Sequence, residues 1–398
     1  MDPEAPLHCP ITEVTDIESE ALTELQPLIQ HLQANQPVQQ PTTFPRGTVL
    51  ADGRLDLCKQ NLGPNGCRLI TDALTANTNI TSILLGTDAI GDAGAADVAR
   101  LIERNTHMEV LYLGCNQIQE AGTAALAQAL THNDNVLGLW LKRNPLGLPG
   151  ARALAEMLRH NRRLRTLDLV NTQIGIDGLA AILDVLIHPN RTIERVYLGG
   201  NQIDAAGAQL LATLLKENSS IKALLLNVNH LGDTGAQVLA DALQQNRTLV
   251  ELGLASNGIA GDGGIALMRA IQEHPCLARV DLGYSASTRV LGAQANALGD
   301  AGAQATGEML IYNHVLRWLD LRRNNIGEMG TRALIAGLEH NTTLLKLHLD
   351  GKQNARIVEL LERNQTLHPQ SAPGIDRDVA LTRSVYRTAA KPIHHNDR

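Results

Sequence analysis

The sequence predicts an α/β solenoid, a fold in which a short unit recurs along the chain instead of closing around one core. The unit is clearest in residues 111–138, which begin with a Leu-Tyr-Leu strand at Leu111, turn at Asn116 and enter an alanine-rich helix after Gly122. The next unit begins at Leu139 with a strand of the same pattern. A strand and a helix in every unit of fixed length are typical of repeat proteins, whose core continues from unit to unit.

The period is visible at the first buried position of each expected strand, and it is about 28 residues, within the range of known repeat proteins. Two units are longer than the others. The unit from Leu167 to Val196 is longer by a single position, and the unit from Val280 to Leu319 is extended by the insertion 285–295. Drift in loop length explains this insertion as readily as a function does.

In each strand the two aliphatic residues face one side and the residue between them faces the other. The eleven first positions are Leu55, Ile83, Leu111, Leu139, Leu167, Val196, Leu224, Leu252, Val280, Leu319 and Leu347.

Two polar or small positions recur with the same period. A turn residue follows each strand, where a side-chain amide can bond backbone groups left free at the strand's end. It is Asn116, Asn144, Asn201, Asn229, Asn257, Asn296 or Asn324, and elsewhere Gln60, Asp88 or Thr172. A glycine stands near each helix start, at Gly94, Gly122, Gly150, Gly178, Gly207, Gly235, Gly263, Gly302 and Gly330. We expect a backbone conformation or a close approach that admits no Cβ atom there.

Residues 1–54 do not fit the repeat and are expected to form an N-terminal helical cap and a linker. Residues 18–35 have apolar residues at helical spacing, and Pro27 predicts either a kink or two shorter helices. Residues 36–45 are rich in Pro and Gln and are interpreted as the linker. A cap is needed because the first repeat would otherwise expose an apolar end and a sheet edge.

The repeats are expected to occupy residues 55–365, with eleven strands and a C-terminal cap. After Leu349 the pattern fails, and a helix over 354–364 is the expected cap. Residues 366–398 lack periodicity, which predicts a flexible tail. Apolar residues within this tail leave open a docked extension along the last repeat.

Composition and cysteine usage limit the function classes. The net charge is −7 without a long run of either sign, which argues against a nucleic-acid binder and against an anionic-membrane binder. Five cysteines are an odd number, widely spread and without a CxxC pair, so we expect no disulfide framework, no zinc site and a reducing compartment. Neither a secretory signal nor an apolar run of membrane-spanning length is visible. These features predict a cytoplasmic protein.

The unit LxLxxNxIGxxGxxxLAxxLxxNxxLxx resembles the ribonuclease-inhibitor type of leucine-rich repeat over residues 55–365. It is also similar to the repeats of NOD-like receptors and of the Ran GTPase-activating protein. The resemblance implies a horseshoe with parallel strands on its concave face and helices on its convex face. It further implies that a protein binds along the concave strands.

The chain departs from each of these families. Its period is nearly uniform and its cysteines are few, unlike ribonuclease inhibitors. It has no GxxxxGK[ST] loop, so the nucleotide-binding function of NOD-like receptors is not expected. The tail is not strongly acidic, unlike that of the Ran activator, which weakens a GTPase-activating function.

The aromatic residues give the candidate binding surface. Five of the eight in the chain lie on the expected strands or directly after them: Tyr112, Trp140, Tyr197, Tyr284 and Trp318. Leu84 and Leu225 occupy the same strand position on neighbouring repeats, and Asp168 interrupts the apolar stripe. Aromatic residues favour strands in general, but core positions here contain almost none. The stripe is therefore predicted to bind a partner through exposed aromatic anchors.

Charged residues border the stripe, and they are also candidates for partner binding. They are Lys142, Arg143, Arg195, Asp320, Arg322 and Arg323. A rim of mixed sign suits a protein partner better than nucleic acid, although these charges could equally be a solvated surface. No catalytic or metal-ligating arrangement stands out, so no cofactor is expected.

The sequence thus predicts a non-enzymatic scaffold for protein–protein interaction, with a partner of unknown identity. Two alternatives remain open at this point. One is a regulator of a small GTPase, which rests on the repeat resemblance. The other is a bacterial effector directed to a host cell, delivered by a route that leaves no recognisable signal.

Overall fold

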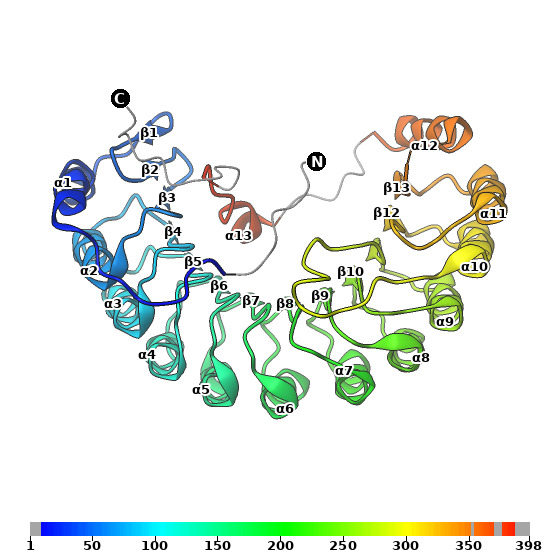
Figure 1. Cartoon of the computed structure of the whole chain (residues 1–398), viewed down its shortest axis with the longest axis horizontal. Helices are drawn as coiled ribbons and strands as arrows, with labels where there is room; N and C mark the ends of the chain where they lie inside the picture. Colours follow the sequence, from blue (N-terminus) through cyan, green and yellow to red (C-terminus); the bar gives the residue numbers. More distant parts are fainter. Residues whose placement is uncertain (1–8, 352–353, 370–375, 387–398) are drawn as a thin grey trace. The chain divides into compact units, whose positions relative to one another are not determined.

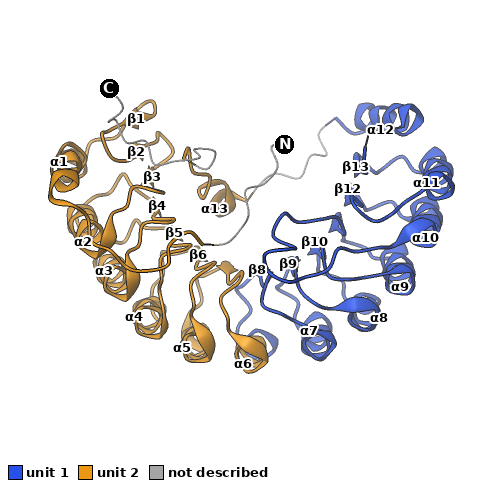
Figure 2. Ribbon diagram, viewed as in Figure 1, with its two compact units in different colours: residues 1–8, 186–374 blue, residues 9–185, 375–398 orange. Residues whose placement is uncertain are grey.

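The computed structural model describes residues 9–351, 354–369 and 376–386 and divides the chain into two compact units (Figures 1 and 2). Among the described residues, unit 2 comprises 9–185 together with 376–386, and unit 1 comprises those from 186 onward to 369. In both units a short strand alternates with a helix, so the predicted α/β solenoid is confirmed.

Unit 2 begins with a helix and an antiparallel pair of short strands and continues with strand–helix repeats. Its elements are α1 (Ser19–Ala34), β1 (Thr42–Thr43), β2 (Thr48–Val49), β3 (Arg54–Asp56), α2 (Gly63–Leu74), β4 (Ser82–Leu84), α3 (Gly91–Arg104), β5 (Val110–Tyr112), α4 (Glu120–Leu130), β6 (Gly138–Trp140), α5 (Gly147–His160), β7 (Thr166–Asp168), most of α6 (Gly175–Ile187), and the short α13 (Arg377–Ala380).

Unit 1 repeats the same alternation and ends with a helix that follows its last strand. Its elements are β8 (Arg195–Tyr197), α7 (Ala205–Glu217), β9 (Ala223–Leu225), α8 (Gly232–Leu243), β10 (Glu251–Gly253), α9 (Gly261–Gln272), β11 (Arg279–Asp281), α10 (Gly299–Tyr312), β12 (Trp318–Asp320), α11 (Glu328–His340), β13 (Lys346–His348) and α12 (Ala355–Leu367).

The strands within each unit are parallel from β3 onward and pair in chain order. Their register joins equivalent residues of successive repeats, for example Ile83 with Leu111 and Tyr112 with Trp140. Each of the eleven predicted strand positions is the middle residue of one of the strands β3 to β13. In each unit the helices of the repeats lie on one side of the strands, here called the helix side (Figure 1). Leu111 and Leu113 are fully buried toward it, and the residues between such leucines face the opposite, strand side.

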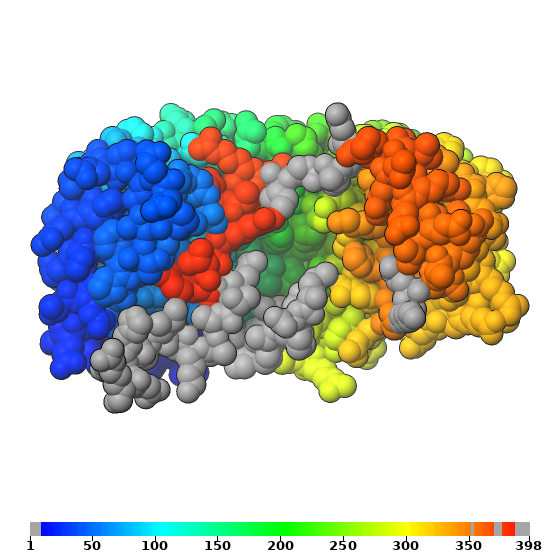
Figure 3. Space-filling view, turned by 90° about the horizontal axis from the view of Figure 1, so that it is seen from above, coloured from blue at the N-terminus to red at the C-terminus, as the bar shows by residue number. Residues whose placement is uncertain are grey.

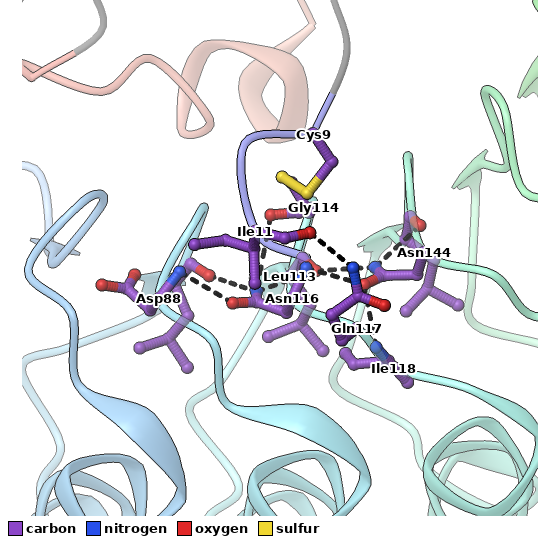
Figure 4. The surroundings of a disulfide bond; sticks show 12 residues. Cys9, Ile11, Asp88, Leu113, Gly114, Asn116, Gln117, Ile118 and Asn144 are labelled. Atoms are coloured by element: carbon purple, nitrogen blue, oxygen red, sulfur yellow. Dashed lines mark hydrogen bonds between the residues drawn. A yellow bond between two sulfur atoms is a disulfide. The ribbon is translucent and has the colours of Figure 1, made fainter. Parts of the chain in front are cut away.

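Buried asparagines connect the turns of successive repeats (Figure 4). The Asn144 Oδ1 accepts hydrogen bonds from the backbone N–H groups of Asn116 and Ile118, at 2.8 and 3.1 Å. Its Nδ2 donates to the carbonyls of Leu113 and Leu141, both at 2.9 Å. Asn116 bonds the preceding repeat in the same way, through the N–H of Asp88. The turn asparagine therefore satisfies backbone groups of its own repeat and of the one before.

A second row of asparagines stands at the other end of the helices. Asn161 is an example: its Nδ2 donates to the carbonyl of Leu130 in the preceding repeat, and its Oδ1 accepts from the N–H groups of Arg163 and Leu164. Asn161 is buried and its backbone is extended, not left-handed. The hydrogen bonds of the Asn161 side chain therefore cap the end of α4 and bind the N–H groups that follow α5. Each repeat is thus bonded to the previous one at both ends of its helix.

The recurring glycine near each helix start is explained by close approach. A Cβ atom on Gly122 would lie 2.6 Å from Asp92 Oδ1 and 2.9 Å from Ala95 Cβ, both on the preceding helix. The backbone of Gly122 does not have a positive φ. Of the two reasons expected from the sequence, close packing of neighbouring helices is therefore the one that applies here.

The N-terminal residues before α1 run along the turns of the first repeats, and they correct one prediction. Cys9 forms a disulfide with Cys115, at a sequence separation of 106, and the Gln117 side chain donates to the Ile11 carbonyl (Figure 4). Further along, the Asp16 carboxylate accepts two hydrogen bonds from Asn65. The prediction of no disulfide was wrong because no short spacing marks a pair so distant in sequence. The reducing compartment inferred from the cysteines loses its support.

The caps also differ from the sequence prediction in detail. The segment 18–35 contains a single helix, α1 (Ser19–Ala34), with Pro27 inside it, and the expected linker 36–45 contains the strand β1. At the other end of the chain, α12 continues to Leu367. Residues 376–386 were expected in a flexible tail or along the last repeat, but they lie against the strands of unit 2. Residues 370–375 and 387–398 of the predicted tail fall outside the described residues.

Replacing Asn144 by alanine should strongly destabilise the protein. The change leaves two N–H groups and two carbonyls without their amide partner in a buried turn, and each such group costs about 1–3 kcal/mol. We expect the free energy of unfolding to fall by at least about 4 kcal/mol, the sum of these four costs at their lower bound, in urea denaturation followed by circular dichroism. Gln128→Ala, which removes an exposed amide from α4, is the control and should change it by less than about 0.5 kcal/mol. Equal effects of the two changes would contradict the role of the buried amide.

Asp88 should make stability depend on pH, because it occupies a turn position where most repeats have asparagine. Its Oδ1 accepts from the Gln60 N–H at 2.7 Å, while its Oδ2 is buried and has no hydrogen-bond partner among the described residues. Burial raises the pKa of this carboxyl well above its usual range. A raised pKa in the folded state favours folding at low pH, and this contribution is lost as pH rises through the folded pKa.

Asp88→Asn should therefore stabilise the protein at pH 7 and leave it unchanged below about pH 4. Since one unit of pKa shift corresponds to about 1.4 kcal/mol, the gain at pH 7 should exceed about 1 kcal/mol. Urea denaturation at pH 4, 5.5 and 7 measures it. The reciprocal change Asn116→Asp should lose stability over the same pH range. A pH-independent difference for both variants would show that ionisation at this position is not the cause.

Candidate functional site

The strand side carries the residues that the repeat does not specify. Parallel register aligns them in one row in each unit. In unit 2 this row is Asp56, Leu84, Tyr112, Trp140 and Asp168. In unit 1 it is Tyr197, Leu225, Gly253, Asp281, Asp320 and His348. Half of the residues predicted to bind a partner belong to these two rows, and the other half lie beside them on or after the same strands.

In unit 2 the predicted anchors are covered by the chain itself. Leu84 is fully buried and Trp140 is only 3% exposed, whereas the sequence predicted an open face. The cover is the segment from Asp376 to Tyr386, here called the C-terminal segment. In Figure 1 its helix α13 lies on the strand side of unit 2, and in Figure 3 its red atoms lie against the blue atoms of the first repeats.

The C-terminal segment inserts apolar side chains between those of the strands. Leu381 packs with Val110 and Trp140, and Val379 adds to this cluster. Tyr386 packs with Leu84 and Cys58, in a second cluster. The Tyr112 ring touches both clusters and is half-buried. The aromatic and aliphatic residues of the predicted stripe therefore form a small core with the segment.

Polar groups of unit 2 bind the main chain of the segment. The Asp56 carboxylate accepts from the Val385 N–H at 2.6 Å and from the Ser384 hydroxyl at 3.1 Å. The Ser82 hydroxyl donates to the Leu381 carbonyl at 3.0 Å. The Arg54 guanidinium donates to the carbonyl of Arg383. Contacts of this kind bind main-chain groups that every residue of a polypeptide offers.

Two further polar contacts lie at the ends of the segment. The Tyr386 hydroxyl shares a buried hydrogen bond of 2.7 Å with the Thr48 hydroxyl. Burial raises the pKa of Tyr386, so this hydroxyl remains protonated at neutral pH. At the other end, Arg377 forms an ion pair of 3.1 Å with Glu109. Burial, helped by the charges of Asp56 and Asp88, also raises the pKa of the Cys58 thiol beneath the Tyr386 ring.

The remaining predicted residues of unit 2 lie next to the covered stripe. The Lys142 ammonium stands 5.1 Å from the centre of the Tyr112 ring, in a cation–π arrangement. Asp168 is buried, and burial raises the pKa of its carboxyl, although the charges of Lys142 and Arg143 act in the opposite direction. Their predicted role in partner binding stays a prediction.

Unit 1 presents a different strand side, with ion pairs between aromatic residues. Glu251 accepts from Arg195 at 2.6 Å and lies 3.5 Å from Arg279. Arg279 in turn stands 5.2 Å from the centre of the Trp318 ring. Tyr197 and Leu225 are half-exposed on the neighbouring strands β8 and β9. The surface is therefore mixed, with apolar side chains around paired charges.

The second charged group of unit 1 lies at the ends of β11 and β12. The Arg322 guanidinium binds the buried Asp320 carboxylate at 2.6–3.1 Å. Arg323 is exposed and lies 4.6 Å from the centre of the Tyr284 ring. Burial raises the pKa of Asp281 to about 6, and the neighbouring Asp320 carboxylate contributes to the shift.

The insertion 285–295 follows Tyr284 and does not disturb the repeat. The Ser285 N–H and the Thr288 hydroxyl both donate to the Ser256 hydroxyl, at 3.0 and 2.7 Å. Asn296 then resumes the turn position, since its Oδ1 accepts from the N–H groups of Asn257 and Ile259. The insertion is thus anchored to the preceding turn.

Several residues that build these surfaces were not predicted from the sequence. Asp56 and Ser82 bind the C-terminal segment, and Glu251 and Arg279 form the ion pairs of unit 1. Ser82, Glu251 and Arg279 are each the first residue of a strand. Because side chains alternate along a strand, they face the strand side together with the third residue of the same strand. The period of two predicts that they share this side, but Arg195 and Trp318 are the two residues at that strand position which the sequence singled out, on account of their charge and aromatic ring. Asp56 stands at the same strand position as Leu84 and Tyr112, but it lies in the first repeat, before the aromatic stripe begins.

In the described part of the chain, no group of three or more His, Cys, Asp or Glu side chains is placed to hold a metal ion. Each helix found there is too short or too polar to cross a bilayer.

Comparison with known proteins supports the repeat. The family described as leucine-rich repeat matches residues 104–127, 160–183, 190–212, 217–240 and 245–268. A solved structure of leiomodin-1 actin-binding site 2 is 21% identical, covering 49% of this chain and 92% of that chain with a TM-score of 0.33. The tropomodulin C-terminal domain of Caenorhabditis elegans is 14% identical, covering 55% and 94% with a TM-score of 0.29.

The family match names no subclass, so the resemblance to the ribonuclease-inhibitor type stays a prediction. The five matched segments all fall within the part of the chain where strand, turn asparagine and helix recur with the same period. The match and the repeated hydrogen bonds of the turns agree with each other. The matched part of the chain consists of leucine-rich repeats.

Proposed function

We propose that this protein is a non-enzymatic scaffold that binds a protein partner on the strand side of unit 1. The observation that carries the proposal is the C-terminal segment on unit 2. There, residues that the repeat does not specify hold the polypeptide from Asp376 to Tyr386 through both main-chain and side-chain contacts. The strand side of this fold is thus able to bind polypeptide, and unit 1 offers a comparable set of positions.

The chemistry of unit 1 favours a protein partner. Tyr197, Leu225, Tyr284 and Trp318 are half-exposed, and side chains of this kind act as anchors when a partner excludes water from them. The cation–π partners Arg279 and Arg323 hold two of these rings in place before binding. A partly preorganised surface loses less conformational entropy when a partner docks.

The paired charges make nucleic acid a poor ligand. Arg195 and Arg279 share Glu251, and Arg322 is neutralised by Asp320. Nucleic-acid affinity depends on cations that are free to replace the counterions of phosphates. Arginines that already bind carboxylates lack that freedom, and they suit instead a protein surface of mixed polar and apolar character.

Partner binding should be sensitive to changes on the strand side of unit 1 and insensitive to matched changes on its helix side. Placing a photoreactive phenylalanine derivative at Tyr284 should crosslink the partner in an extract of the native cells. Tyr312, an aromatic residue 63% exposed at the end of α10, is the matched position on the helix side and should not. Mass spectrometry then identifies the crosslinked partner.

With the purified partner, Trp318→Ala and Tyr197→Ala should each weaken binding by about 2 kcal/mol, or roughly 30-fold in Kd. Isothermal calorimetry measures the loss. Tyr312→Ala should leave Kd within twofold, and all three variants should keep the wild-type circular dichroism spectrum. Crosslinking at Tyr312 but not at Tyr284, or an unchanged Kd for both strand-side variants, would overturn the proposal.

A further inference from the structure

We propose that the strand side of unit 2 is a second, peptide-specific binding site, and that the C-terminal segment is its internal occupant. The external ligand would be a peptide with two aliphatic residues two positions apart, followed three and five positions later by serine and tyrosine. This is the chemistry of Val379, Leu381, Ser384 and Tyr386 in the segment. The proposal does not depend on partner binding by unit 1.

In this site, contacts to the main chain give affinity for a peptide, and contacts to side chains give specificity. Ser82 and Arg54 bind main-chain carbonyls of the segment, and Asp56 binds a main-chain N–H, so they would hold any peptide of the same conformation. Selection comes from side chains: Leu381 is 5% exposed beside Trp140, and the Tyr386 ring is 8% exposed. A peptide lacking either side chain would leave an apolar surface open to water.

The repeat itself does not require the residues that make this site. The helix-side leucines and turn asparagines build the fold, and they recur in both units. Asp56, Ser82 and Leu84 stand at variable positions. Unit 1 repeats an aspartate or a leucine at the position of Asp56 and Leu84, as Asp281 and Leu225, but it has no serine at the position of Ser82. In unit 1 that position carries Arg195, Ala223, Glu251, Arg279, Trp318 and Lys346. The match between unit 2 and the segment is therefore specific to this unit and not a consequence of the fold.

An occupant in the same chain has a large advantage over a free peptide. Tethering typically gives an effective concentration in the millimolar range, so an external peptide with the same contacts must reach that concentration to displace the segment. In the wild-type protein the site should consequently be closed to weak ligands. A natural ligand must bind more tightly than the segment, or the segment must first be weakened.

The buried tyrosine hydroxyl adds a test of the ligand's chemistry. It bonds Thr48 at 2.7 Å and lies in the same small polar region as the Asp56 carboxylate. A phosphate on this hydroxyl would bring about two negative charges beside Asp56 and would need space that the packed ring does not leave. A peptide phosphorylated on tyrosine should therefore be rejected.

The experiment weakens the internal occupant and supplies a probe from outside. The full-length chain carries Leu381→Asp and Tyr386→Ala, and the probe is a fluorescein-labelled peptide with the sequence of residues 376–386, DRDVALTRSVY. We expect fluorescence anisotropy to show at least tenfold tighter binding to this double variant than to the wild-type chain. A scrambled peptide and the tyrosine-phosphorylated peptide should not bind to the double variant.

A third change locates the site. Ser82→Ala in the background of the double variant removes the bond to the Leu381 carbonyl and should weaken the probe several-fold, while Ser220→Ala in unit 1 should not. Thermal unfolding confirms that every variant remains folded. Equal probe binding by wild-type and double variant, or no binding by either, would overturn the proposal.

Cys58 reports independently whether the segment covers the site in solution. The thiol is buried in one cluster with Tyr386, so iodoacetamide should modify it at least tenfold faster in the double variant than in the wild-type chain. The partly exposed Cys276 in the same molecule is the reference and should react equally in both. Equal rates at Cys58 would show that the segment does not cover it. Light scattering should give a monomer, since a dimer with exchanged segments would contradict an internal occupant.

Discussion

The structure depends above all on the buried amide of the turn asparagine. In one side chain, Asn144 bonds two N–H groups and two carbonyls that belong to two successive repeats. Because these groups are fully buried, any other relative position of the two repeats would leave several of them unsatisfied. The amide thus fixes how each repeat stacks on the previous one, and the stacked leucines then pack into a continuous core.

Fixed stacking has a consequence for function. It aligns the residue between the two leucines of every strand, so side chains that stand one full repeat apart in the sequence become neighbours on the strand side. Because these positions contribute little to the core, they are free to differ between repeats. In unit 2 they contribute to a surface that fits a polypeptide segment. In unit 1 they include the half-exposed Tyr197 and Leu225, while the ion pairs of Glu251 and the Trp318 ring come from the first residue of each strand, which faces the same side.

The two surfaces also differ in the groups that bind their carboxylates. In unit 1 each carboxylate of Glu251 and Asp320 is bound by a neighbouring arginine of the same surface. In unit 2 the Asp56 carboxylate is bound by an N–H group and a hydroxyl of the C-terminal segment. Removing the segment would take hydrogen bonds from Asp56 as well as apolar cover from Leu84 and Trp140. The segment is therefore part of the packing of unit 2 and not only an addition to its surface.

The sequence by itself determined the repeat: the centres of β3 to β13, the turn asparagines and the helix-start glycines were all readable, because each depends on contacts between adjacent repeats at a constant spacing. It also placed Tyr112, Trp140 and Trp318 on the strand side. Only the tertiary structure decided what covers that side. The Cys9–Cys115 disulfide and the contacts of Asp56 with Ser384 and Val385 join residues at sequence separations of 106, 328 and 329. Contacts so distant follow no period, so they exist only once the stacked repeats have formed the surface that receives them.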